Sequence, residues 1–216
     1  MFNKTRLDRQ YDQSYISSVA RVRQNELLRN ELLDQGVAIF MQQGYHGTGI
    51  QEIVDKVGIP KGSFYNYFKS KEEFGSEAII HYSNQFKEFL SSILQTSKKD
   101  TLLALNQFFD NLTNLFDDKD CKDGCLIGNF AAEISDSSKL GRETMSKCIR
   151  EWKDIIKEIM IRGQEKKVIR DDISPDELAD FLLNFLEGSL IRMKIEANTS
   201  PLKQMKKTFL DHALKR

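Results

Sequence analysis

The stretch TGIQEIVDKVGIPKGSFYNYF, residues 48–68, decides how this chain folds. Its first half predicts a short helix with one apolar face, because large aliphatic residues recur there at i, i+3, i+4 and i+7. Thr48 is placed to cap that helix, with Gln51 completing a capping box, and Gly58 is placed to end it. Pro60 fits the first position of a second helix, where its missing N–H costs nothing. The stretch therefore predicts two short helices joined by a tight turn.

The second helix carries polar residues at its beginning and apolar ones further on. Phe64 and Phe68 lie one turn apart and are placed to dock inward, which leaves the leading residues near the surface. This is the arrangement of a helix-turn-helix, in which the second helix enters the DNA major groove and reads base edges. Lys61 can reach a guanine edge or a phosphate, Gly62 allows a close approach, and Ser63 can donate or accept at a base edge.

Other side chains near this helix suit the DNA backbone. Tyr65 can hydrogen-bond a phosphate or lay its ring on a thymine methyl group, and Tyr67 and Lys71 are placed for the flanking backbone. Thr48 and the first N–H groups of its helix form an anion site that suits a phosphate oxygen. The alternative is that both tyrosines belong to the core and that Lys61 and Lys71 are ordinary solvated lysines.

The whole chain is predicted to be all-α. Only 3 of its 216 residues are proline, and no sustained run of alternating β-branched residues indicates a strand. The formal net charge is zero, so the argument for DNA rests on the local stretch. A helix over 24–43 is expected before it, with Gly36 in its middle and Gly44 placed to end it in a left-handed conformation. Longer helices are expected after it, over 70–96, 99–117, 125–135, 138–166, 175–197 and 200–215.

This pattern divides the chain into three segments. Ser70 and Glu73 predict a capping box for the helix that begins there. Pro175 and Pro201 each follow a serine, which is typical of a helix start. The segments are a loosely ordered or helical extension, a three-helix DNA-binding domain and a larger helical domain: residues 1–23, 24–72 and 73–216.

The cysteines suggest either a sensor or plain packing. Cys121, Cys125 and Cys148 are an odd number, which disfavours a disulfide scaffold and fits a reducing compartment. Cys121 and Cys125 lie just before or at a helix start, where a thiol can have a lowered pKa and react with oxidants or electrophiles. The alternative is that both are small buried hydrophobic residues. A zinc site is not expected, because only two cysteines cluster and the histidines lie far away.

Aromatic residues of the C-terminal half are candidates for lining a ligand cavity, although most residues at helical spacing serve packing. Together with a thiol and two polar groups that can orient a ligand, the candidate contacts are Tyr82, Phe108, Cys125, Asn129, Trp152 and Phe185. Apolar stripes also follow the last two predicted helices and can serve the core or a partner: Leu178, Phe181, Leu182, Phe185 and Leu186, then Met205 and Phe209.

Several function classes are disfavoured. Residues 1–23 lack the apolar core of a secretory signal, and no run of about 20 uncharged apolar residues is present. A cytoplasmic protein without a membrane partner is therefore expected. The sequence has no Gly-rich phosphate loop, nucleophile elbow or histidine-containing metal motif, so we predict neither an enzyme nor a cofactor or metal site.

The segment from about residue 29 to 75 resembles the DNA-binding signature of the tetracycline-repressor (TetR) family. The resemblance rests on many residues at fixed spacing, in Gly44-Tyr45-x-x-Thr48-x-Ile50-x-x-Ile53-x-x-x-Val57-Gly58-Ile59-x-Lys61-Gly62-Ser63-Phe64-Tyr65-x-Tyr67-Phe68-x-Ser70-Lys71-Glu72. It implies an N-terminal three-helix helix-turn-helix domain followed by a C-terminal helical domain that binds a ligand and dimerises. It further implies a homodimeric regulator, usually a repressor, that leaves a palindromic operator when a small molecule binds.

Carried over by position, the resemblance implies DNA contacts by Thr48, Gln51, Lys61, Gly62, Ser63, Tyr65, Asn66, Tyr67 and Lys71. Two positions depart from the family pattern: Pro60 replaces a frequent Ser or Thr cap, and Gln51 replaces a frequent Arg. The resemblance also implies that the last two long helices pair with those of a second copy. Residues 123–129 are similar to a segment of electrophile-responsive members. The alternative function is an architectural DNA-binding protein of the same fold that needs no small ligand.

Overall fold

The computed structural model describes the backbone of residues 6–215 and the side chains of residues 19, 20 and 22–215. Within that part of the chain the secondary structure is helical, without strands, which confirms the all-α prediction. The helices are α1 Arg6–Gly47, α2 Ile50–Val57, α3 Lys61–Phe64, α4 Lys71–Ser97, α5 Thr101–Asp117, α6 Leu126–Ile134, α7 Lys139–Glu165, α8 Pro175–Glu196 and α9 Ser200–Thr208, with a π-helical turn η1 over Phe209–Ala213.

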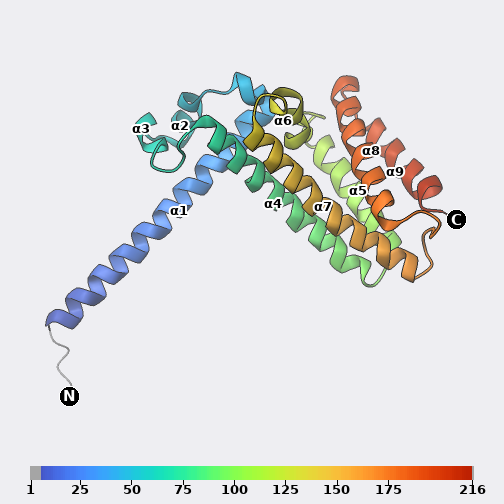
Figure 1. Cartoon of the computed structure of the whole chain (residues 1–216), viewed down its shortest axis with the longest axis horizontal. Coiled ribbons are helices and arrows are strands. Elements are labelled where there is room, and N and C mark those ends of the chain that lie inside the picture. The colour runs from blue at the N-terminus through green and yellow to red at the C-terminus, as the bar shows by residue number, and fades with distance from the viewer. Residues whose placement is uncertain (1–5, 216) are drawn as a thin grey trace, which may run out of the picture.

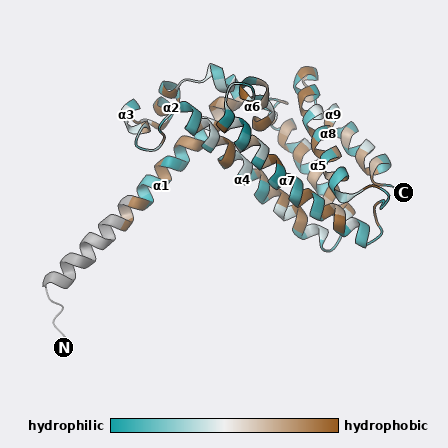
Figure 2. Ribbon diagram, viewed as in Figure 1, coloured by the Kyte–Doolittle hydropathy of each residue, from teal (hydrophilic) through white to brown (hydrophobic). Residues whose placement is uncertain are grey.

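The molecule consists of a small head and a larger helical body (Figure 1). The head contains α2, α3, the C-terminal part of α1 and the first turns of α4. In the body, α4 and α7 pack along each other, while α5, α8 and α9 cover one side. Figure 2 shows hydrophobic and hydrophilic residues alternating along the body helices, as expected for helices that bury one face.

The centre of the head is a cluster of aromatic rings around Phe74 of α4. Its ring centroid lies 5.8 Å from that of Phe40, 5.3 Å from Phe64 and 4.8 Å from Phe68. Gly36 of α1 faces this ring, because a Cβ at that position would lie 2.6 Å from Cε1 of Phe74. A glycine is thus found in the middle of this helix because any larger residue at position 36 would clash with the ring of Phe74. The cluster also fixes the start of α4 against the head.

The first helix is longer than the sequence predicts. α1 begins at Arg6, so the expected start at residue 24 is wrong, and the part of the extension that the structure describes is helical. Residues 1–5 of the predicted extension lie outside the described part of the chain. Gly44 has φ 76° and ψ 177°, which bends the chain at the point where the sequence predicts the helix end. The break at Gly44 agrees with the prediction, but the predicted left-handed conformation is wrong, because ψ is far from that of a left-handed helical residue.

Three predicted helix starts differ from the observed ones. α2 is capped at Gly49 without a side-chain bond, and the hydroxyl of Thr48 donates instead to the carbonyl of Gly44 at 2.7 Å. The predicted capping box of Thr48 and Gln51 is therefore wrong. Pro60 is the residue before the first helical position of α3 and not the first position itself. Thr199 is the cap residue of α9, one position earlier than predicted.

Two other predicted starts agree with the structure. Ser174 and Glu177 form a complete capping box at α8, with Pro175 at the beginning of the helix. Ser70 accepts the N–H of Glu73 at 3.0 Å. The carboxylate of Glu73 accepts from the N–H of Lys69 at 2.5 Å, so the second bond of that box goes to the neighbouring residue. No helix in the described part of the chain is long and apolar enough to cross a membrane.

Candidate DNA-binding face and ligand cavity

The head presents a helix-turn-helix. α2 buries Ile53 and Val54, and Gly58 ends it with φ 75° and ψ 32°. α3 is a single turn that continues as hydrogen-bonded turns, because the N–H groups of Tyr67 and Phe68 both donate to the carbonyl of Phe64. The regular part of the second helix therefore ends at Phe64, and hydrogen-bonded turns continue it to Phe68.

All but one of the residues predicted to face DNA are at least partly exposed on this unit, and the exception is the buried Thr48. Phe64 and Phe68 are buried, as their one-turn spacing predicts. The residues between and before them point away from the core to different degrees. Lys61, Gly62, Tyr65 and Asn66 are exposed, while Ser63, Tyr67 and Lys71 are partly exposed. Tyr65, whose alternative was a core position, is 51 % exposed.

Several of the predicted contact groups already have partners within the chain. The side-chain amide of Gln51 donates to Asp55 at 2.7 Å, and the hydroxyl of Tyr67 donates to Asn25 at 3.5 Å. The ammonium of Lys71 lies over the ring of Tyr45, 4.5 Å from its centroid, and partial burial lowers the pKa of this lysine. Thr48 is 2 % exposed, so its hydroxyl is both covered and bonded in this structure.

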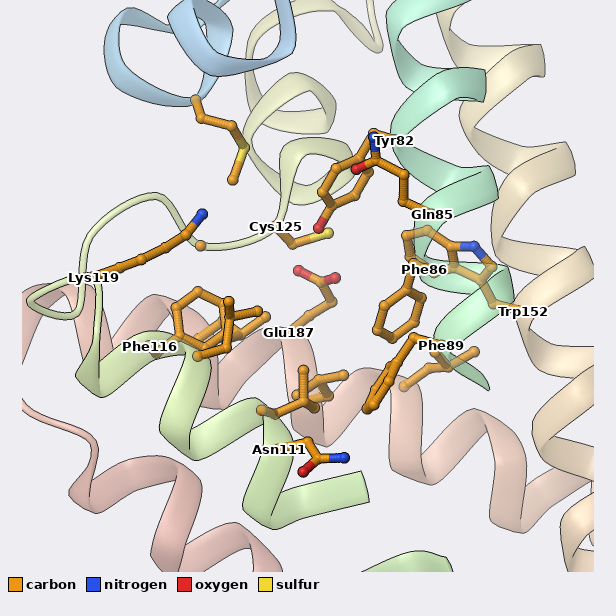
Figure 3. Close-up of a pocket in the computed structure, with 17 residues that line it drawn as sticks. Tyr82, Gln85, Phe86, Phe89, Asn111, Phe116, Lys119, Cys125, Trp152 and Glu187 are labelled. Carbon is orange, nitrogen blue, oxygen red and sulfur yellow. The ribbon is translucent and has the colours of Figure 1, made fainter. Parts of the chain in front are cut away.

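The body encloses a cavity of about 510 Å³, within the size range of small-molecule sites. Its walls come from α4, α5, α7 and α8, with the loop before α6 across one end (Figure 3). Phe116 of α5 lies on one side, and Phe86 and Phe89 of α4 lie on the other. The remaining wall combines aliphatic side chains with about as many that carry a polar group: Met41, Tyr82, Gln85, Asn111, Leu112, Leu115, Lys119, Gly124, Cys125, Trp152, Leu183, Leu186, Glu187 and Leu190.

The structure brings together three of the six predicted ligand contacts, namely Tyr82, Cys125 and Trp152, and they all line this cavity. Phe108 lies outside the lining, stacked on Phe89 at a centroid distance of 5.7 Å. Phe185 also lies outside it and packs against Phe181 at 5.6 Å.

Asn129, the sixth predicted contact, lies beside a neighbouring groove of about 490 Å³. Its side-chain oxygen accepts from the ammonium of Lys194 at 3.4 Å. Cavity and groove share Cys125 and Glu187 in their walls, so the two spaces meet at these side chains.

Cys125 does not have the chemistry of a reactive thiol in this structure. It is the N-cap residue of α6, as predicted, but it is buried. Burial raises the pKa of its thiol, and the nearby carboxyl group of Glu187 raises it further. The expected lowering of this pKa by the helix N-terminus is therefore not found. Cys121 and Cys148 are also buried and free, which agrees with the packing alternative.

Glu187 is the acidic residue of the cavity that the sequence analysis missed. Its carboxyl group lies in the middle of the cavity and points toward Cys125 (Figure 3). Burial raises its pKa, while a hydrogen bond with Cys125 acts in the opposite direction. One signal could have found it: Glu187 lies in the apolar stripe of α8, beside Leu186 and between Leu183 and Leu190. A charged residue in such a stripe is unusual unless it has a partner or a function.

Helix α6 connects the cavity to the head. At its start, Gly124 and Cys125 form part of the cavity wall. Near its end, Glu133 accepts the backbone N–H of Tyr45 through one carboxylate oxygen at 3.0 Å and that of His46 through the other at 2.9 Å. These two residues directly follow the bend at Gly44 and precede the helix-turn-helix.

The outer face of α8 carries exposed apolar side chains. Phe181, Ile191 and Ile195 are 45 %, 58 % and 77 % exposed, while Gly188 between them leaves open space. Phe185, which also belongs to the predicted stripe of α8, is half-buried. The other stripe residues predicted on α8 and α9 are buried in the core: Leu178, Leu182, Leu186, Met205 and Phe209. Among the described residues, no three His, Cys, Asp or Glu side chains lie close enough together to hold a metal ion.

Comparison with protein families identifies both halves of the chain. Residues 32–78 match the model described as "Bacterial regulatory proteins, tetR family". Residues 101–209 match the model described as "Tetracyclin repressor-like, C-terminal domain".

Individual relatives match over most of their length. The chain is 36 % identical to the HTH-type transcriptional repressor DhaR of Mycobacterium sp. (strain GP1) over 177 residues, which cover 82 % of this chain and 87 % of that protein. It is 29 % identical to the HTH-type transcriptional repressor NemR of Escherichia coli (strain K12), over 81 % of this chain and 87 % of the relative.

Solved structures show the same arrangement of helices. A regulatory protein TetR from Rhodobacter sphaeroides superposes with a TM-score of 0.80 at 27 % identity, covering 86 % of this chain and 98 % of that one. The reduced form of E. coli NemR superposes with a TM-score of 0.79 at 27 % identity, covering 85 % and 95 %.

Proposed function

The chain belongs to the tetracycline-repressor (TetR) family of bacterial regulators, and from this premise we propose that it is a ligand-released repressor. As a member of this family it is a DNA-binding transcription regulator and not an enzyme. In detail, the proposal is that a homodimer in the cytoplasm binds a palindromic operator and leaves it when a small molecule occupies the cavity. The observation that carries this proposal is the double role of α6: its cap residue Cys125 lines the cavity, and Glu133 near its end holds the head.

The DNA contacts of the proposal are the nine residues implied by the resemblance. Lys61, Gly62, Tyr65 and Asn66 are the strongest of them, because they are exposed on the helix that would enter the major groove. Gln51 and Tyr67 must first give up a hydrogen bond to another side chain. Thr48, by contrast, supports the phosphate site through the backbone at the start of α2, since its hydroxyl is turned to Gly44.

The dimer of the proposal uses the outer face of α8 together with α9. Phe181, Gly188 and Ile195 are spaced seven residues apart and so lie on one side of the helix. Exposed apolar side chains next to a glycine without neighbours suit close packing against a second helix. We expect the dimer interface to bury well over about 1,000 Å².

Release by a ligand requires that the ligand bind the DNA-free form more tightly than the DNA-bound form. Ligand binding can change the position of Gly124 and Cys125, which both line the cavity next to α6. A shift of α6 would then move Glu133 and, through its two hydrogen bonds, the segment that leads into the helix-turn-helix. A coupling of about 1–3 kcal/mol, typical of allosteric proteins, would change operator affinity about 5- to 150-fold.

A gel shift with the DNA that flanks the gene tests both parts of the proposal. Lys61→Ala is expected to weaken binding about 5- to 150-fold without lowering the unfolding temperature, because the side chain is exposed. Lys99→Ala is the matched control, since Lys99 is an exposed lysine in the turn between α4 and α5. Equal affinity of the wild type and Lys61→Ala would remove this residue from the interface.

The same titration, repeated with a panel of compounds, separates the proposal from its alternative. A ligand-released repressor binds a few palindromic sites and leaves them when one class of compound is added. An architectural protein of the same fold would bind many unrelated duplexes and keep them in the presence of every compound.

A further inference from the structure

The charge inside the cavity restricts the ligand that it can take. Among the described residues of its wall, Glu187 is the only acid and Lys119 the only base. The ammonium of Lys119 is paired with the carboxylate of Asp123 at 3.0 Å, so its charge is already balanced. Glu187 takes part in none of the ion pairs between described residues; its neighbours are the uncharged groups of Cys125 and Tyr82.

Burial opposes ionisation of Glu187 and raises its pKa, whereas its position at the start of a helix acts in the opposite direction. The carboxylate lies against the first turn of α6, where a Cβ on Gly128 would come within 2.5 Å of its Oε2 atom. A helix N-terminus carries a partial positive charge that stabilises an adjacent anion. This partial charge does not replace a counterion. A bound cation would supply one and would favour the ionised form of Glu187.

The walls around this carboxylate are built from aromatic side chains. Phe86 and Phe89 lie on one side of it and Phe116 on the other, with Trp152 beyond Phe86 (Figure 3). The ring centroids of Phe86 and Trp152 are 4.6 Å apart, so these two form one continuous wall. Aromatic faces attract cations and also accept apolar groups, whereas they offer nothing to an anion.

We propose that this cavity binds a lipophilic organic cation, whose positive charge pairs with Glu187 while its apolar part lies among Phe86, Phe89 and Phe116. The proposal rests on the assignment of the cavity as the effector site and adds the chemical class of the effector. Carboxylates and phosphates are excluded by the same geometry, because Glu187 would repel them and no free base in the wall would bind them. Neutral apolar compounds of the same shape fit the cavity but leave the partly buried carboxyl group of Glu187 without a charged partner.

A pair of isosteric probes tests the proposal on the full-length protein. The cation is (4-hydroxymethylphenyl)trimethylammonium, and the neutral isostere is 4-tert-butylbenzyl alcohol, which has the same shape without the charge. Trp152 is the only tryptophan of the chain and lies in the cavity wall, so its fluorescence reports binding of either probe, with calorimetry as a second readout. We expect the wild type to bind the cation at least about tenfold more tightly than the isostere, which corresponds to about 1.4 kcal/mol.

The variant Glu187→Gln keeps the size of the side chain and removes its charge. It is expected to bind the isostere as the wild type does and to lose the preference for the cation. Glu196→Gln is the matched control, because it removes an acid from the same helix outside the cavity wall and should keep the preference. Equal affinity of the wild type for both probes, no binding of the cation, or an unchanged preference in Glu187→Gln would each overturn the proposal.

Adding the operator separates this inference from the proposed function. If the cation binds at Glu187 but the protein stays on its operator, the proposed chemical class of the ligand stands, and the proposal that ligand binding releases the operator fails. If another class of compound releases the operator while the cation does not bind, ligand release stands and the cation proposal fails.

Discussion

The bonds of Glu133 to the bend at Gly44 give the sharpest prediction about how body and head are joined. Glu133→Ala removes two hydrogen bonds between a carboxylate and backbone N–H groups, of 3.0 Å to Tyr45 and 2.9 Å to His46. A hydrogen bond to a charged group contributes about 1.5–3 kcal/mol when it is buried. Because Tyr45 is half-buried and His46 is exposed, we expect about 1 kcal/mol from each bond and about 2 kcal/mol from both.

The assay is thermal unfolding of the full-length protein, followed by circular dichroism. For a chain of this size, 1 kcal/mol corresponds to about 2–4 °C, so Glu133→Ala should unfold about 4–8 °C below the wild type. Glu143→Ala is the control, because Glu143 is an exposed acid on α7 whose carboxylate lies 3.8 Å from the ammonium of Lys139. A decrease of less than about 1 °C in Glu133→Ala would refute the assigned role of these bonds.

Gly44→Ala tests the same contact from the opposite side. A Cβ on Gly44 would lie 2.9 Å from Cδ of Glu133, and its φ of 76° is strained for alanine. The variant should therefore displace the carboxylate and break the same two bonds. Because both changes remove one interaction, the double variant should be more stable than the sum of the single changes predicts, by about 1–2 kcal/mol. Strict additivity would show that the clash and the hydrogen bonds are independent.

Three further predictions concern packing, pH and thiol chemistry. Gly36→Ala should destabilise the protein by about 1–3 kcal/mol in thermal unfolding despite the better helix propensity of alanine, because its Cβ displaces the ring of Phe74; Gly62→Ala, whose Cβ meets nothing within 4 Å, should fold as the wild type does. Burial raises the pKa of Glu187, so its contribution to stability is complete below the ordinary value of 4.5 and is lost as the pH rises through the higher folded value. Glu187→Gln should consequently gain stability relative to the wild type as the pH rises above 4.5, and parallel pH curves of the unfolding temperature would contradict this. The buried thiol of Cys125, whose pKa is raised, should react with iodoacetamide at neutral pH at least about tenfold more slowly than a free cysteine, and equally fast alkylation would contradict the geometry.

The helix-turn-helix was predictable because each of its signals is local in the sequence. The one-turn spacing of Phe64 and Phe68 identifies the buried side of the second helix, and both residues are buried. The predicted cap at Thr48 failed for a local reason as well. The bend at Gly44 leaves its carbonyl group within reach of the Thr48 hydroxyl. The hydroxyl donates to this carbonyl group and does not cap α2. A pattern of residue types shows that a cap is available, but it does not show whether another hydrogen-bonding partner lies nearer to the hydroxyl.

The ligand cavity was only partly predictable, because its wall depends on which helices converge. Phe89 and Phe108 both lie within predicted helices, yet only Phe89 lines the cavity, while Phe108 stacks on it from outside the lining. Glu187 is one of 32 acidic residues in the sequence, and only its apolar neighbours in the stripe of α8 distinguish it. The surroundings of Glu187 are formed by the first turn of α6, which lies against the carboxyl group, and by aromatic residues of α4 and α5. Local spacing in the sequence thus indicates the proposed DNA face, whereas helix packing forms the proposed ligand site. An acid in an apolar stripe is the sequence feature that comes closest to indicating the ligand site.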